Sequence, residues 1–510
     1  MLTDVLSTLT LGLISFLCTT QGLISVSVVA VAVWLYSFTK CVRSLPPGPK
    51  PWPLVGNLKE LKNSSLAVYT HNLSKKYGPV FTIFLGWRPA IVIATIEAAT
   101  EACVVRGDDF ADKPTLVSTG VIGDSGSDVA FAALSDATKY RRKVVMQSLR
   151  QYMTGSQHID RVHSVVEETI TNIQSHEGAF LLEDHTFFAI FNVLHTLCFG
   201  NTLPMRSRTY RELADFFQRT SASFSSMFLE DEFPILRHLN MTRLRNLKLD
   251  MKFFHEYLDK HIAGSSDKCN DGVSMTSLVD HILSTKQKLD DGDSPELQAG
   301  FTSRHVRSLL TDVFFAGIDS SSHTLRWIFL VLALKQDVQK KIQKEIDDVV
   351  GRGVPSRDNR AGLLYTEAVI MEVMRLYPVV PMGVPHMTYR ATQVSTQPLP
   401  GGTFVMFNLY AIMRDPAHWE NPDSFMPERF FSEDQSSLTK PKSWIPFGTG
   451  QRSCVGEQLA RVNLLYIVTG LLQRLTFTFP PDDVRPDLST PPDWFNRPCP
   501  PFKVIATPRS

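Results

Sequence analysis

The chain has 510 residues, 43% of them hydrophobic, which is enough to bury a large core. Its 52 Lys and Arg residues nearly balance 51 Asp and Glu residues, and this formal charge of +1 argues against a general attraction to nucleic acid. The seven cysteines are scattered and never form a Cys-x-x-Cys pair, which excludes an obvious disulfide framework or zinc site and suits a reducing compartment.

An uncharged, apolar segment lies near the N-terminus. No charged residue occurs between Asp4 and Lys40, and this stretch holds enough apolar residues to span a bilayer, which takes about 20. A cleaved signal peptide is the alternative, but the start is acidic and the basic residues Lys40 and Arg43 follow the apolar run. Basic residues stay on the cytoplasmic side, so we expect residues 1–44 to form an uncleaved anchor and residues 45–510 to face the cytosol.

A proline-rich segment follows the anchor. Residues 45–53 read Leu-Pro-Pro-Gly-Pro-Lys-Pro-Trp-Pro and cannot form a helix, because proline removes a backbone donor and fixes φ. We expect a stiff hinge between the anchor and the globular part. Residues 80–85 and 90–94 are rich in β-branched side chains and flank the turn Gly86-Trp-Arg-Pro, which predicts a two-stranded hairpin.

The middle of the chain, from residue 159 to about residue 344, has a mainly helical pattern. A long helix predicted over residues 309–334 is very apolar but contains Ala-Gly-Ile-Asp-Ser at its centre. Glycine costs about 1 kcal/mol relative to alanine inside a helix, and buried hydroxyls can bend a helix by bonding to carbonyls one turn back. A purely structural helix would avoid both, so this stretch is a candidate functional site. A kink with incidental polar groups is the alternative.

An acid and a base are paired on the next helix, predicted over residues 365–377. Glu372 and Arg375 are three residues apart, so they lie on one face and can meet. Surface helices contain many such pairs, and the pair alone is a weak signal. The position of the pair in the chain makes it informative, because it is followed in order by Phe-Met-Pro-Glu-Arg-Phe at residues 425–430 and by Cys454.

The most informative stretch reads Phe-Gly-Thr-Gly-Gln-Arg-Ser-Cys-Val-Gly, residues 447–456. Its glycines let a flat object approach the backbone closely. A mostly apolar helix is predicted directly after it, so free N–H groups and a positive dipole end lie beside Cys454 and favour a thiolate. Arg452 adds a fixed positive charge that could hold an anionic group of the same ligand. On the cysteine alone, an ordinary buried thiol is the alternative.

The pattern Phe-x-x-Gly-x-Arg-x-Cys-x-Gly resembles the haem-binding loop of the cytochrome P-450 family, the haem-thiolate monooxygenases. The resemblance implies that the cofactor is haem b, iron protoporphyrin IX, that Cys454 is the axial iron ligand and that Arg452 contacts a haem propionate. A thiolate donates electron density to iron and favours O–O cleavage. The cofactor-binding loop would then include Phe447, Gly450, Arg452, Cys454 and Gly456.

Two further motifs occur in the order found in this family. Ala-Gly-x-Asp-Ser resembles its Ala-Gly-x-(Asp/Glu)-Thr, in which small residues, here Ala316 and Gly317, open a groove over the haem. The acid and the alcohol, here Asp319 and Ser320, are implied to supply protons during oxygen activation. Serine keeps the hydroxyl but lacks the methyl group that restricts rotation. The Glu/Arg/Arg triad of the family is matched by Glu372, Arg375 and Arg429, which we assign to the fold and to haem retention.

The match is weaker at other positions. The family usually carries Trp-x-x-x-Arg at the start of a helix, with both side chains on a propionate. Here Arg141 fits the arginine, but Ala137 stands in place of the tryptophan. His386 follows a segment expected to pass near the haem and is a further propionate candidate, although an isolated histidine is as often unrelated to function. By the same resemblance, the candidate substrate contacts are Val380, Met382 and Phe495.

The resemblance covers residues 45–507 and implies a mainly α fold with a smaller β region, the cytochrome P-450 fold, preceded by the N-terminal transmembrane helix. The hinge and two short stretches, residues 110–114 and 128–131, are similar to animal microsomal members, in particular the steroid 17-hydroxylases and the hydrocarbon-inducible subfamilies. We therefore expect a single-pass protein of the endoplasmic reticulum membrane, with residues 45–510 as its catalytic domain.

The implied activity is insertion of one oxygen atom from O2 into a lipophilic substrate, a steroid or a planar aromatic compound. The chain contains no Gly-x-Gly-x-x-Gly fingerprint, so electrons must come from NADPH through a membrane-bound flavoprotein reductase, with cytochrome b5 as a second candidate donor. Two alternatives stay open: an isomerase or dehydratase of this family that acts on peroxides without a reductase, and a non-enzymatic haem sensor. The intact acid–alcohol pair argues against both.

Overall fold

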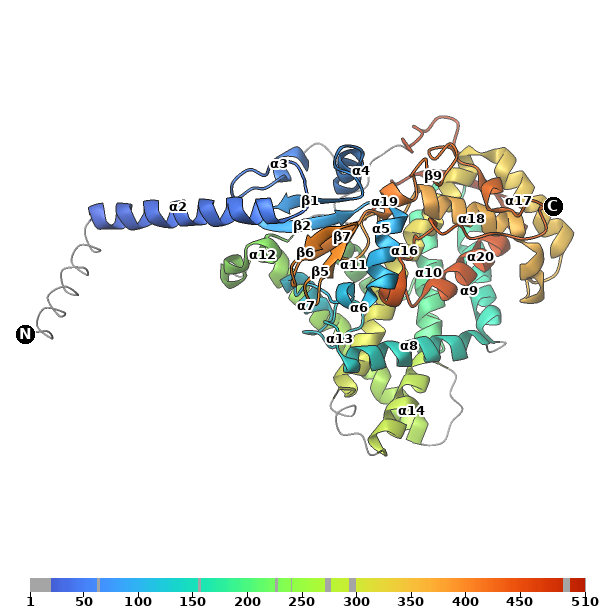
Figure 1. The fold of residues 1–510 in the computed structure, drawn as a ribbon. Coiled ribbons are helices and arrows are strands. Elements are labelled where there is room, and N and C mark those ends of the chain that lie inside the picture. Colours follow the sequence, from blue (N-terminus) through green and yellow to red (C-terminus); the bar gives the residue numbers. More distant parts are fainter. Residues whose placement is uncertain are drawn as a thin grey trace, which may run out of the picture.

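The structure is a computed structural model that describes residues 20–61, 65–154, 157–224, 228–239, 241–270, 277–292, 300–488 and 496–509. Helices dominate, and strands β1, β2, β5, β6 and β7 lie on the side of the body that faces helix α2 (Figure 1). The expected mainly α fold with a smaller β region is confirmed. The longer helices are α2 (Thr20–Ser44), α4 (Leu66–Tyr77), α8 (Asp136–Thr154), α9 (Gln157–Gln174), α10 (Glu183–Phe199), α11 (Arg208–Ser223), α13 (Thr242–Asn270), α14 (Leu278–Asp290), α16 (Ser303–Leu334), α17 (Gln336–Val349), α18 (Leu364–Leu376) and α20 (Glu457–Arg474).

Short elements connect the longer ones. The short α-helices are α3 (Leu58–Leu61), α5 (Ile96–Thr100), α6 (Gly107–Phe110), α7 (Val117–Ile122), α12 (Leu229–Glu232) and α19 (Leu409–Ile412). A π-helical turn η1 (Glu101–Val105) follows α5, and the 3₁₀ turns are η2 (Pro234–Leu239), η3 (Asp358–Gly362), η4 (Pro427–Phe430) and η5 (Gly450–Arg452). The strands are β1 (Val80–Leu85), β2 (Arg88–Ile93), β3 (Phe180–Leu181), β4 (His386–Met387), β5 (Thr392–Val394), β6 (Gln397–Leu399), β7 (Phe404–Phe407), β8 (Leu475–Thr478) and β9 (Lys503–Pro508).

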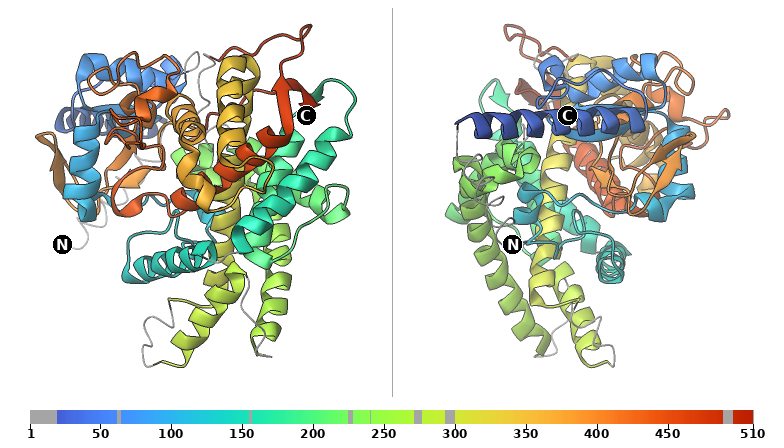
Figure 2. Two further views of the ribbon diagram at one scale, coloured as in Figure 1. Left: turned by 90° about the vertical axis from the view of Figure 1, so that its right-hand side faces the viewer. Right: turned by 60° about the vertical axis from the view of Figure 1, so that its left-hand side comes forward.

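Helix α16 forms the centre of the helical body (Figure 2). It packs against α10, α13, α18, α20 and β8, which explains why its sequence is apolar on nearly every side. Leu309, Phe314, Trp327 and Ile328 are fully buried along its length. The helix begins six residues before the predicted start and ends at the predicted residue, Leu334.

The largest sheet has the strand order β1-β2-β7-β4. Strands β1 and β2 form the predicted antiparallel hairpin, with Val80 opposite Ile93, and β2 runs parallel to β7, with Ala90 opposite Phe404. A second sheet has the order β3-β9-β8, and β5 and β6 form a two-stranded ribbon. Alternate residues of the β1/β2 hairpin feed two separate apolar cores, one on each face.

Helix α2 projects from this body (Figure 1). Its segment Ile24–Ser44 has a mean hydropathy of 1.6 and none of its most apolar window is buried, so its length and composition fit a membrane span. The hinge that follows is fixed to the sheet, because the Thr82 N–H donates to the Pro47 carbonyl (3.0 Å) and the Thr82 hydroxyl to the Pro46 carbonyl (2.7 Å). A Cβ on Gly48 would lie 1.9 Å from the Thr82 oxygen, so only glycine permits this contact.

Candidate active site

The Cys454 loop joins turn η5 to helix α20. The Cys454 N–H donates to the Phe447 carbonyl (2.9 Å). Helix α20 begins at Glu457, directly after Gly456, and the N–H groups of Gly456 and Glu457 both point at the Cys454 sulfur. Burial raises the pKa of Cys454, whereas these two N–H groups and the charge on Arg142 act to lower it. The side chain is nevertheless accessible. The loop therefore presents one sulfur, supported by backbone donors, to a ligand.

The glycines of the loop have different tasks. Gly450 has φ +75°, and a Cβ there would lie 2.0 Å from the Cys103 carbonyl oxygen, so this glycine lets the loop approach turn η1. Glycine was expected in this loop so that a flat ligand could approach the backbone. The close contact with Cys103 is a second reason for glycine at position 450. A Cβ on Gly456 would meet the Cys454 sulfur at an ordinary 3.8 Å. Phe447 packs edge-on against Trp444, with ring centres 6.1 Å apart.

One buried and two half-buried cations gather beside this loop. Arg452 donates to the carbonyls of Ala111 (2.7 Å), Val129 (3.1 Å) and Ala132 (2.8 Å). Lys113 is 4% exposed and donates to the Pro385 carbonyl (3.0 Å), while Arg142 donates to the Ser453 carbonyl. Burial and the charge of Arg452 hold the pKa of Lys113 well below its usual value, and burial and Arg142 lower the pKa of Arg452. Mutual repulsion of this kind favours an anionic ligand.

The sequence patterns did not indicate Lys113 and Arg142 as site residues. Lys113 lies in the stretch at residues 110–114 that already resembled the steroid-hydroxylase type, and Arg142 lies directly after Arg141 in a basic run. Arg141 itself donates to the carbonyls of Gly300 (3.1 Å) and Gly126 (3.2 Å) and to Thr138, and faces Asp128 and Asp312. Its contact with a cofactor stays a prediction.

His386 lies at the edge of the same cluster. Its Nδ1 is 2.7 Å from the Phe110 carbonyl, to which it must donate. Burial and the nearby Lys113 hold the pKa of His386 well below its usual value, so the imidazole is neutral. Its Nε2 then carries no hydrogen, and a contact with an anion would require the ring to take up a proton.

The second motif lies on helix α16. Ala316 is exposed and Ser320, one turn later, is partly accessible, whereas most of the helix is buried. The Ser320 hydroxyl donates to the Ala316 carbonyl (2.6 Å), the expected bond to a carbonyl one turn back. Gly317 was expected to help open a groove. In the structure it lies against α10, where a Cβ would be 2.8 Å from Leu194 Cδ1. Its small size serves helix packing.

Asp319 lies between three hydrogen-bond donors. Ser221 Oγ is 2.7 Å from one carboxylate oxygen, His323 Nε2 is 3.5 Å from the same oxygen, and Asn496 Nδ2 is 3.4 Å from the other. Burial acts to raise the pKa of Asp319, but His323 and Ser221 outweigh it and hold the pKa below its usual value. The hydroxyl of the neighbouring Ser320 instead donates to its own helix. Asp319 is thus an anion at neutral pH.

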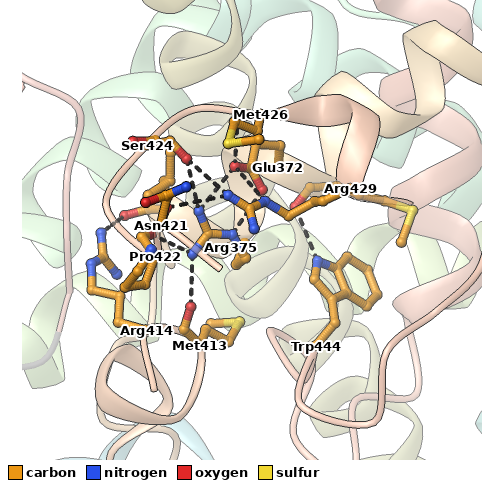
Figure 3. Close-up of polar contacts among 12 residues, drawn as sticks. Glu372, Arg375, Met413, Arg414, Asn421, Pro422, Ser424, Met426, Arg429 and Trp444 are labelled. Carbon is orange, nitrogen blue, oxygen red and sulfur yellow. Dashed lines mark hydrogen bonds and ion pairs between the residues drawn. The ribbon is translucent and has the colours of Figure 1, made fainter. Parts of the chain in front are cut away.

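The structure brings the predicted triad together (Figure 3). Arg375 donates to both oxygens of Glu372 (2.7 and 2.9 Å), and Arg429 donates to one of them (3.2 Å). The Met426 N–H is a further donor at 2.9 Å. Glu372 and Arg375 are 0% exposed, and Arg375 also donates to backbone carbonyls of residues 413, 422 and 424. The triad fixes α18 to the segment that precedes the Cys454 loop.

The candidate substrate contacts fare differently. Val380 is half-buried after the end of α18. Met382 is 1% exposed, lies in the apolar core under the sheet and receives a hydrogen bond from Thr70 on α4 (3.6 Å). The side chain packs among the apolar residues of the sheet core. Its role as a substrate contact stays a prediction. Phe495 lies outside the described residues.

Comparison with known proteins decides the family. The sequence profile described as Cytochrome P450 matches residues 46–506. This chain belongs to the cytochrome P450 family. Its sequence is 31% identical to that of the steroid 17-alpha-hydroxylase/17,20 lyase of Mesocricetus auratus, and the alignment covers 91% of this chain and 93% of the relative. It is also 31% identical to cytochrome P450 2U1 of Rattus norvegicus, with 89% of each chain covered.

A solved zebrafish cytochrome P450 structure with progesterone superposes on this cytochrome P450 with a TM-score of 0.79 at 28% identity, covering 88% of this chain and 100% of that one. The family, the fold and the class of enzyme are therefore established: a monooxygenase whose cofactor is haem b.

The residues of this cytochrome P450 fit that cofactor. The accessible Cys454 sulfur, with backbone donors around it and cations near its loop, fits a thiolate ligand and partners for anionic groups. Lys113, Arg142 and Arg452 would hold the haem propionates, and the exposed Ala316 would face the haem. Bound haem supplies the chemistry of oxygen insertion. The N–H groups of Gly456 and Glu457 would favour the thiolate form of Cys454, the form in which a cysteine binds iron.

Gly450→Ala tests the contact between the loop and Cys103. Its positive φ alone costs about 1–3 kcal/mol for alanine, and the close carbonyl adds to that. Gly448→Ala is a matched control, because Gly448 also has positive φ (+72°) but its nearest neighbour would lie 4.0 Å from the new Cβ. We expect Gly450→Ala to lose clearly more bound haem and thermal stability than Gly448→Ala. Equal losses would show that the contact with Cys103 contributes nothing.

Proposed function

We propose that this cytochrome P450 is a membrane-anchored monooxygenase that inserts one oxygen atom into a steroid, with electrons from an NADPH-dependent flavoprotein reductase. The observation that carries the reaction is the Cys454 sulfur, which is accessible and supported by backbone donors, with the buried Lys113 and two half-buried arginines near its loop. The steroid rests on likeness to the 17-alpha-hydroxylases and to the structure with progesterone. A planar aromatic substrate is the second candidate.

The anchor is residues 1–44, and residues 45–510 form the catalytic domain in the cytosol at the endoplasmic reticulum membrane. The exposed apolar face of α2 supports the anchor, and the basic residues Lys40 and Arg43 after it support the cytosolic side. The chain contains no Gly-x-Gly-x-x-Gly fingerprint, which supports an external electron donor. Exposed Lys139 and Lys143 on α8 suit the docking of an acidic donor, either the reductase or cytochrome b5.

Within the site, the protein has three tasks. The loop around Cys454 orients the sulfur, the cations fix the anionic edge of the cofactor, and Asp319 and Ser320 handle protons on the accessible side of α16. Ser320 is poised for this task because its hydroxyl is accessible and already donates to a carbonyl, so it can also accept a proton from water and pass one on.

The full-length protein in lipid vesicles, loaded with haem and supplied with a flavoprotein reductase and NADPH, provides the test. Progesterone, other steroids, fatty acids and planar aromatics are offered under ¹⁸O₂. We expect a steroid product that gains one labelled oxygen, with NADPH consumed. A product formed from a peroxide substrate without reductase would contradict the proposal in favour of an isomerase or dehydratase, and labelled products from aromatics alone would move the substrate to that class.

A further inference from the structure

Asp319 connects three elements that are far apart in sequence. Its carboxylate receives Ser221 from the last turn of α11, Asn496 from the segment before β9, and His323 from the next turn of α16. Helix α11 and residues 496–499 both cover α16 on this side. A single ionised side chain thus holds two covering elements to the central helix, and His323 is the partner that α16 itself provides.

The orientation of His323 is fixed by its other nitrogen. Its Nδ1 lies 3.3 Å from the Cys499 N–H and 3.4 Å from the Arg326 guanidinium. Both groups only donate, so Nδ1 must present its lone pair. The ring hydrogen is therefore on Nε2, the nitrogen that faces Asp319. With its hydrogen on Nε2, the ring is a directed donor to the carboxylate.

Arg326 closes the arrangement toward the surface. Its side chain is 5% exposed, and it pairs with Glu183 on α10 (2.7 Å) and donates to the Cys499 carbonyl (2.9 Å). Glu183 is 39% exposed, and Asp184 lies beside it. The charged groups that face His323 are thus Asp319 and Arg326 from α16, with Glu183 and Asp184 from α10 behind Arg326.

We propose that His323 is a positioning residue that keeps Asp319 a carboxylate, bonded to α11 and to residues 496–499. Asp319 then takes up a proton from water only after the contact between His323 and Asp319 opens. The proposal rests on the proposed monooxygenase function, in which Asp319 handles protons. It assigns the control of that step to a histidine outside the acid–alcohol motif. The contact couples the protonation of Asp319 to movement of the two covering elements.

A double-mutant cycle tests the lock without any turnover. His323→Ala, Asp319→Ala and the double variant are compared with the wild type as haem-loaded full-length proteins, and thermal unfolding midpoints are measured. Each single change removes one partner of a half-buried pair. We therefore expect each to lower the midpoint by about 2–4 °C and the double variant to lower it by no more than the larger single change. Additive shifts would overturn the proposal.

The pH profile separates positioning from mere packing. In the wild type, the ratio of peroxide released to product formed is expected to stay constant between about pH 6 and pH 8.5, because Asp319 stays ionised throughout. In His323→Ala, the carboxylate keeps its burial but loses a donor, so its pKa rises and the ratio becomes pH-dependent, by about twofold or more. His323→Gln, whose amide can donate, should restore the constant ratio. A constant ratio in His323→Ala would contradict the proposal.

The two tests can fail separately. If the wild type oxygenates none of the substrates offered, the proposed function fails, yet the thermal cycle still decides whether His323 locks Asp319. If the wild type is active but the thermal shifts add, the proposed function stands and the lock is wrong.

Discussion

Cys454→Ala is expected to abolish NADPH-dependent oxygenation completely, while the helical fold is retained. The sulfur of Cys454 is the group to which the loop directs the N–H donors of Gly456 and Glu457, and alanine leaves no atom there to bind iron. Cys454→Ser keeps a similar volume, but its hydroxyl gives up a proton far less readily than a thiol, so it should be nearly as inactive. Product formation and bound haem are measured together with circular dichroism.

The matched control is Cys41→Ser. Cys41 lies at the end of α2, away from the loop, and is half-buried. Its replacement should leave product formation within error of the wild type. If Cys454→Ala still formed product at the rate of this control, the assignment of the iron ligand would be wrong.

Glu372→Gln is expected to cause the largest loss of stability, about 3–5 kcal/mol, because it removes one partner of a fully buried ion pair. Glutamine has nearly the same volume, so packing is preserved. Arg375 and Arg429 would then face a neutral amide, and the bonds that hold α18 to the segment before the Cys454 loop would weaken (Figure 3). Denaturant unfolding and haem retention report the two consequences separately.

Asp348→Asn provides the same change of acid to amide at an exposed helical pair. Lys344 and Asp348 lie 2.6 Å apart on α17, with side chains 76% and 62% exposed, and water screens such a pair. We expect no measurable change in unfolding. Comparable losses in Glu372→Gln and Asp348→Asn would mean that the buried triad has no special role in stability.

Local patterns predicted much of this protein. The apolar period gave α16, α18 and α20, and β-branched residues around a turn gave the β1/β2 hairpin, because each signal lies within one element. The pair Glu372 and Arg375 could be assigned to one helix face from its spacing alone. Ten consecutive residues were enough to select the Cys454 loop as the candidate haem-binding loop, so no tertiary information was needed.

Contacts between distant segments could not be predicted in the same way. The partners of Asp319 lie 98 residues before it and 177 after it, and nothing in a local pattern connects them. The same holds for the carbonyl of Cys103, which lies against Gly450. Met382 packs in the apolar core under the sheet, and no pattern in its local sequence indicates that contact.

The central claim is that the sulfur of Cys454 binds the haem iron, and the absorption spectrum of the reduced carbon monoxide complex tests it most directly. Purified wild-type protein should give the thiolate type of spectrum, and Cys454→Ala should not. A wild-type spectrum of the imidazole type, or a purified protein that takes up no porphyrin at all, would contradict the account.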